Sequence, residues 1–92
     1  MTAIQVLDGH RLSISGDMTM SEVPELLKTI ASLTAVTHID LSSVGRVDSS
    51  ALTVLLACSR AARGATVTVH HAPPSLRALN DLYGLQTLFW VV

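Results

Sequence analysis

The segment DLSSVGRVDSSAL, residues 40–52, contains the change from strand to helix around which the rest of the chain is arranged. Residues 36–41 (VTHIDL) alternate and are rich in β-forming types, which predicts a central strand. Residues 42–47 are expected to form a polar loop, and residues 48–50 (Asp-Ser-Ser) supply three candidate caps for a helix that Gly64 ends. The inner face of this helix is expected to hold Leu52, Leu55, Leu56, Ser59 and Ala62.

The residues before this segment predict a β-hairpin followed by a helix. Residues 4–7 and 12–14 flank the turn triplet Asp8-Gly9-His10, and Gly16-Asp17 is expected to close the second strand. Ser21 then offers an N-cap for the helix. The buried face of this helix is predicted from the helical spacing of Val23, Leu26, Leu27, Ile30 and Leu33.

The residues after the segment predict a strand, a helix and a final strand. Residues 65–69 read as a strand, Pro73-Pro74-Ser75 opens a third helix that Gly84 ends, and residues 88–92 are short enough for an edge strand. The inner stripe of the third helix is expected to hold Leu76, Leu79, Leu82 and Tyr83. The element order is therefore ββαβαβ(α)β. It predicts a single α/β domain over residues 1–92, with a mixed sheet and helices packed on one or both faces.

The composition excludes several classes of function. Hydrophobic residues make up 49% of the chain and charged residues only 14%, with a formal net charge of −1. The basic residues are scattered from Arg11 to Arg77 without a cluster, so we expect no nucleic-acid binding and no direct binding to anionic membrane surfaces. The N-terminal stretch MTAIQVLDGH lacks the regions of a signal peptide. The longest apolar run, residues 51–58, is far shorter than the roughly 20 residues of a membrane span. These features predict an intracellular protein.

Residues suited to catalysis or metal binding are few. Cys58, the single cysteine, lies in an apolar helical pattern, which predicts a buried and unreactive thiol. His70 and His71 are adjacent and would point to opposite faces of a strand, while His10 and His38 have no second ligand at a useful spacing. The histidines are therefore expected to be solvated or structural. Because no nucleophile elbow and no glycine fingerprint for phosphate binding occur, we expect no catalytic residue and no cofactor. The positions of the histidines lead us to expect no metal.

Ser49 allows two interpretations. A serine at the start of a helix caps the backbone, which stabilises the helix by about 1 kcal/mol. The same hydroxyl, exposed beside a helix N-terminus, is also suited to recognition by a partner or to accepting a phosphoryl group, which the helix dipole favours. Asp40 and Asp48 would oppose the added negative charge. The sequence leaves both interpretations open.

The segment DLSSVGRVDSSAL resembles the signature of STAS domains, in which a strand ends in Asp-Leu-Ser and a helix begins with Asp-Ser/Thr-Ser/Ala-Gly-Leu. The hairpin, the turn at Gly16 and residues 82–85 (LYGL) fit the same pattern, so the resemblance covers nearly the whole chain. It implies a four- or five-stranded mixed sheet with helices on one side. It also implies a module that regulates a partner and catalyses no reaction.

Within that family the chain looks closest to the MlaB-like subunit of the Mla phospholipid-transport ABC system, which supports outer-membrane lipid asymmetry. The resemblance implies that the domain binds the cytoplasmic ATPase subunit and supports its stability and activity. It would therefore be cytoplasmic and peripheral to the inner membrane through its partner. The partner-binding surface is expected to lie at the start of the second helix, flanked by the third. It is expected to comprise Arg46, Asp48, Ser49, Ser50 and Thr53.

The alternative within the family is an anti-sigma factor antagonist. In such antagonists the serine in the position of Ser49 is the target of a partner kinase, which makes Ser49 a candidate phosphorylation site. Two departures favour the transporter subunit. Antagonists usually carry an acidic residue where this chain has Thr19, and the glycine of the helix-start motif is Ala51 here.

Overall fold

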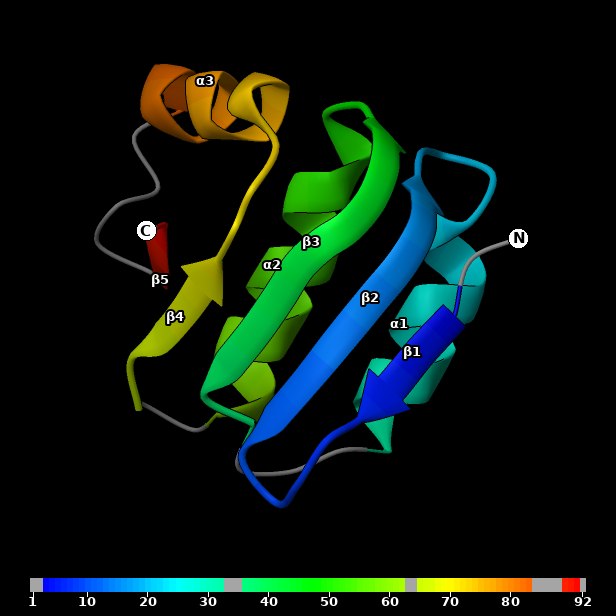
Figure 1. The fold of residues 1–92 in the computed structure, drawn as a ribbon, viewed down its shortest axis with the longest axis vertical. Coiled ribbons are helices and arrows are strands. Elements are labelled where there is room, and N and C mark those ends of the chain that lie inside the picture. The colour runs from blue at the N-terminus through cyan, green and yellow to red at the C-terminus, as the bar shows by residue number, and fades with distance from the viewer. Residues whose placement is uncertain (1–2, 33–35, 63–64, 84–88, 92) are drawn as a thin grey trace.

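The computed structural model describes residues 3–32, 36–62, 65–83 and 89–91. Strands and helices alternate along these residues after an initial pair of strands (Figure 1). The elements are β1 (Ala3–Val6), β2 (Arg11–Met18), α1 (Val23–Ala31), β3 (His38–Val47), α2 (Ser50–Ala61), β4 (Val67–His70), α3 (Pro74–Tyr83) and β5 (Phe89–Val91). This order confirms the predicted succession of strands and helices.

The strands form one five-stranded sheet whose spatial order, β1-β2-β3-β4-β5, is also their order along the chain. Strands β1 and β2 are antiparallel, and β2 to β5 are parallel to one another. Parallel neighbours need a crossover connection, and the three helices provide one for each such pair. Helices α1 and α2 pack together on one face of the sheet, whereas α3 lies beyond the end of β4 and contacts α2 (Figure 1). The predicted α/β fold with a mixed sheet is confirmed.

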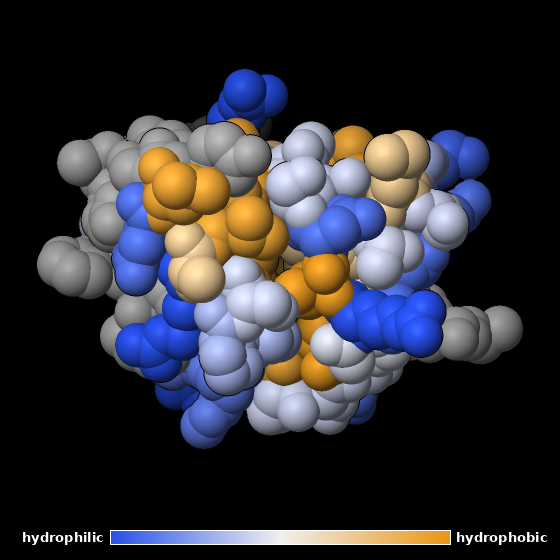
Figure 2. Space-filling model, turned by 90° about the horizontal axis from the view of Figure 1, so that it is seen from above, coloured by the Kyte–Doolittle hydropathy of each residue, from blue (hydrophilic) through white to orange (hydrophobic). Residues whose placement is uncertain are grey.

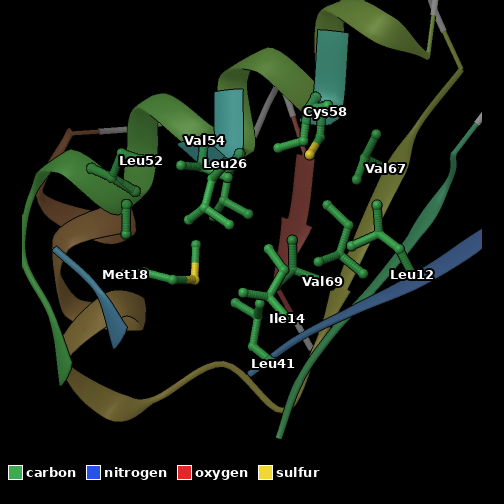
Figure 3. Close-up of a cluster of buried hydrophobic side chains, with 14 of the residues drawn as sticks. Leu12, Ile14, Met18, Leu26, Leu41, Leu52, Val54, Cys58, Val67 and Val69 are labelled. Carbon is green, nitrogen blue, oxygen red and sulfur yellow. The ribbon is translucent and has the colours of Figure 1, made fainter. Parts of the chain in front are cut away.

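The hydrophobic core lies between the sheet and the layer formed by α1 and α2. Strand β2 alternates, so that Leu12, Ile14 and Met18 point toward the helices and are at most 1% exposed (Figure 3). Cys58 of α2 points into the same core and is 1% exposed. Burial raises the pKa of the Cys58 thiol to about 12, so it stays protonated at neutral pH. The prediction of a buried thiol is confirmed.

The buried stripe of α2 differs in part from the prediction. Leu52 and Leu55 are buried as expected, but Leu56 and Ser59 are only half-buried. The buried positions are Ala51, Leu52, Val54, Leu55, Cys58 and Ala62. The stripe is therefore shifted toward smaller residues at helical spacing, which let the helix approach the sheet closely.

Helix α3 also differs in the residues it buries. Leu76 is fully buried and Leu79 packs partly against the core, as predicted, but Leu82 is 76% exposed. The inner position is taken by Asn80, which is 2% exposed. The cause is helix geometry, because Asn80 lies one turn after Leu76 on the same face, whereas Leu82 falls on the side facing away.

Strands β2 and β3 are longer than predicted. Residues 42–47, expected to be a loop, continue β3 and pair with β2, with Ser15 opposite Ser43 and Met18 opposite Val47. Strand β2 likewise continues through Gly16, which adopts φ 86°. Two register irregularities allow this pairing, and glycine tolerates the left-handed backbone there.

Helix α1 begins one residue later than predicted. Glu22, not Ser21, is at its N-cap position, and no side chain bonds the cap. Thr19 Oγ1 instead donates a hydrogen bond to Glu22 Oε1 at 2.7 Å, which fixes the entry to the helix. Leu33, Gly64, Gly84, Leu88, Val92 and the side chain of Tyr83 lie outside the described part of the structure.

None of the helices in the described part of the chain has the length and apolar character needed to cross a membrane.

Candidate functional site

The candidate site lies at the edge of the sheet where β2 and β3 end. Asp48, between β3 and α2, joins two segments there. Its Oδ1 accepts a hydrogen bond from the Ser50 backbone N–H at 2.8 Å, and its Oδ2 accepts one from the Met20 N–H at 3.1 Å. Asp48 therefore caps α2 and holds the β2–α1 connection against it. The cap comes from this carboxylate rather than from a serine, since Ser49 makes no side-chain cap bond.

The hydrogen bonds to Asp48 stabilise its charged form. The bond from the Met20 N–H is the main cause that holds the pKa of this carboxyl below its usual value. Asp48 is therefore a fixed negative charge beside Ser49 at neutral pH.

The lowered pKa of Asp48 predicts a loss of stability in acid. The bonds contribute fully above the ordinary aspartate pKa of about 3.9 and are lost as the pH falls through the lower folded value. Asp48→Asn is therefore expected to make the free energy of unfolding less dependent on pH below about pH 5. Urea unfolding at a series of pH values measures this slope. Equal slopes for variant and wild type would show that Asp48 does not contribute.

A second carboxylate joins the ends of β2 and β3. Asp17 Oδ1 accepts a hydrogen bond from the Arg46 backbone N–H at 2.9 Å. A Cβ atom on Gly45 would stand 3.0 Å from the same Oδ1, so glycine leaves the space that this carboxylate occupies. Asp17 and Asp48 thus bond the β2 side of the site to its β3 side at two points.

Gly45→Ala is expected to lower the free energy of unfolding by about 1 kcal/mol, because the new methyl displaces Asp17 from the Arg46 N–H. Gly9→Ala is the matched control, since nothing lies within 4 Å of the added atom. Urea unfolding of both variants, of Asp17→Ala and of the double variant with Gly45→Ala and Asp17→Ala measures the effect. If the Gly45 and Asp17 substitutions were additive, the proposed clash would be wrong.

The predicted partner-binding residues differ in what the structure leaves available. Ser49, Thr53 and Arg46 have exposed side chains, whereas Asp48 and Ser50 are half-buried and bonded to each other. Ser49 and Thr53 are four residues apart at the start of α2 and lie on the same side of the helix. The hydroxyl groups of Ser49 and Thr53 and the Arg46 guanidinium are therefore the groups that a partner can reach.

Sequence reasoning missed three residues of this edge. Met20 is 73% exposed beside Asp48, and Asp17 and Gly45 lie near the ends of β2 and β3. Figure 2 views this end of the molecule and shows apolar atoms at the surface over α3, where Leu82 is 76% exposed. A methionine in a short connection and an aspartate after glycine are common, so no sequence signal marked them.

Within the described residues, no three His, Cys, Asp or Glu side chains are placed to hold one metal ion.

Comparison with known proteins identifies relatives. A model of the family described as "Mlab, STAS domain" matches residues 4–91. A solved anti-sigma factor antagonist from Mycobacterium paratuberculosis is 28% identical, with a TM-score of 0.76, covering 99% of this chain and 83% of the other. The anti-sigma factor antagonist SpoIIAA in its unphosphorylated form is 17% identical, with a TM-score of 0.70, covering 100% of this chain and 87% of the other.

The Bacillus cell fate determinant SpoIIAA in its phosphorylated form is 18% identical, with a TM-score of 0.70, covering 100% of this chain and 91% of the other. At this identity the two SpoIIAA structures show that the fold is shared. No curated protein matches the chain.

Proposed function

This chain belongs to the STAS domain family, in the group described as "Mlab, STAS domain", and from that membership we propose that it is a non-catalytic subunit of a phospholipid-transport ABC system. In this role it binds the cytoplasmic ATPase subunit and supports its stability and activity in maintaining outer-membrane lipid asymmetry. The match of the family model to residues 4–91 carries the proposal.

The geometry of the candidate site supports binding rather than catalysis. STAS domains are generally non-catalytic binding modules. The exposed Ser49 and Thr53 hydroxyls, the Arg46 side chain and the apolar Met20 side chain provide polar and apolar contacts at one edge. Protein interfaces typically combine an apolar centre with a polar rim. Two carboxylates, Asp17 and Asp48, bond the segments that carry these groups, so the surface is formed before a partner arrives.

The proposed partner places the protein in the cytoplasm, bound to the inner membrane only through the transporter. Purification of the tagged protein from its native cells, with mass spectrometry of partners and of Ser49, tests the proposal. We expect an ABC ATPase and its permease, with unmodified Ser49. Purification without an ATPase would contradict the proposal.

A second candidate function is that of an anti-sigma factor antagonist regulated by phosphorylation of Ser49. The similarity to the mycobacterial antagonist supports it, as does the exposed Ser49 side chain at the start of α2. Two departures from the antagonist pattern weigh against it, namely Thr19 in place of an acidic residue and Ala51 in place of the glycine of the helix-start motif. An anti-sigma kinase among the partners, together with phosphate on Ser49, would establish this alternative.

A further inference from the structure

The sheet face opposite α1 and α2 carries a pair of histidines that is separate from the partner-binding edge. No described helix lies in front of this face in the view of Figure 1. His38 of β3 and His70 of β4 are both half-buried there. The register pairs His38 with Thr68 and Asp40 with His70, so the two histidines are diagonal neighbours on the same face.

The two imidazole rings are in direct contact. His38 Nδ1 and His70 Nε2 are 3.0 Å apart, and the rings stack with centroids 5.3 Å apart and planes at 29°. The two nitrogens share one hydrogen bond, and the tautomers of the rings decide which nitrogen donates. The pairing of β3 with β4 brings His70 beside His38, a contact that spacing along the sequence does not predict.

A third histidine lines the same hollow. Strand β4 ends at His70, and His71 adopts φ 57°, so the alternation of side chains along a strand does not apply to it. The hollow has a volume of about 210 Å³. Its lining comprises Leu7, Arg11, Leu12, His38, Asp40, His70 and His71.

We propose that His38 Nδ1 and His70 Nε2 form a bidentate binding site for a divalent transition-metal ion, such as Ni²⁺, Cu²⁺ or Zn²⁺. Two imidazole nitrogens that bind one ion at about 2.0–2.1 Å lie about 2.9–3.4 Å apart for ligand angles from about 90° to 109°. The observed separation of 3.0 Å falls in this range. The ring protons then occupy His38 Nε2 and His70 Nδ1, and water completes the coordination.

The charges around the pair decide how strongly an ion is held. Asp40 lines the same hollow and places a carboxylate beside the pair, and its Oδ1 accepts a hydrogen bond from the Ser42 backbone N–H at 2.9 Å. Arg11, opposite His38 in the register, opposes the cation. The site thus selects borderline metals through its nitrogen donors rather than through a high negative charge.

The experiment is calorimetric titration of the protein without a polyhistidine tag at neutral pH, using CoCl₂, NiCl₂, CuCl₂ and MgCl₂ separately. We expect one site, with affinity rising from Co²⁺ through Ni²⁺ to Cu²⁺ and no binding of Mg²⁺. His38→Gln and His70→Gln are each expected to weaken Ni²⁺ binding by about 100-fold, because a chelate loses its second ligand. His10→Gln, in the β1–β2 turn, is the matched control and should bind like the wild type.

A second variant keeps the test valid if a histidine substitution disturbs folding. Arg11 is exposed, and Arg11→Gln should tighten Ni²⁺ binding a few-fold by removing the opposing charge. Ni²⁺ should also raise the Tm of the wild type and of His10→Gln, but not that of folded His70→Gln. The proposed site would be overturned if the wild type bound Ni²⁺ no more tightly than both histidine variants. It would also be overturned if Arg11→Gln left the affinity for Ni²⁺ unchanged.

Discussion

Ser49→Arg is expected to lower the affinity for the proposed partner, an ABC ATPase, by about 100-fold while the domain stays folded. Ser49 is exposed at the start of α2 and makes no cap bond, so no interaction that stabilises the helix is lost. A long cation at this position would separate the surfaces around Thr53 and Met20. Ser49→Asp adds a negative charge beside ionised Asp48 and is expected to weaken binding in the same direction.

The binding prediction needs a control at a distance. Ser32 is exposed and follows α1, and the end of α1 lies at the opposite end of the strands from the start of α2 (Figure 1). Ser32→Arg therefore adds the same charge away from the proposed surface. Titration calorimetry with the purified ATPase measures the affinities, and thermal unfolding verifies that each variant is folded. Wild-type affinity in both Ser49 variants would mean that the interface lies elsewhere. Equal weakening by Ser32→Arg would mean that the effect is general.

Leu55→Ala is expected to lower the free energy of unfolding by about 3 kcal/mol. Leu55 is fully buried between α2 and the sheet, and its truncation leaves a cavity that neighbouring side chains fill only in part. Because domains have a total stability of roughly 5–15 kcal/mol, this loss is a large fraction of the whole. Urea unfolding followed by circular dichroism measures it.

Leu82→Ala is the matched control for Leu55→Ala, since both substitutions remove the same atoms. Leu82 is 76% exposed, so the expected change in the free energy of unfolding is within about 0.5 kcal/mol. A large loss for Leu82→Ala would indicate that this side chain is covered in solution. It would restore the prediction that Leu82 belongs to the inner stripe of α3.

Local pattern was sufficient for the fold because each element carries its own signal. The hairpin turn at residues 8–10, the helical spacing of Val23, Leu26 and Ile30, and the alternation around Ile39 predict elements that the structure contains. The STAS resemblance, which residues 40–52 carry, is confirmed by the family match. The partner-binding role of the five residues from Arg46 to Thr53 stays a prediction.

The sequence-based predictions were wrong or incomplete where the local structure depends on contacts with residues that are distant in the sequence. Residues 42–47 are polar and read as a loop, yet they form a strand because β2 lies alongside and offers backbone hydrogen bonds. Asp48 caps α2, and no rule based on spacing ranks it above Ser49 or Ser50. The contact between His38 and His70 spans 32 positions and depends on the pairing of β3 with β4.

The strands lie in the sheet in the same order as in the sequence, and this has a consequence for folding during synthesis on the ribosome. Each parallel strand pairs with the strand that was translated just before it, and its connecting helix lies between the two in sequence. A nascent chain can therefore extend the sheet from the β1–β2 hairpin without waiting for a strand from later in the message. Apolar strands that would otherwise be open to aggregation find their neighbours already in place as they leave the exit tunnel.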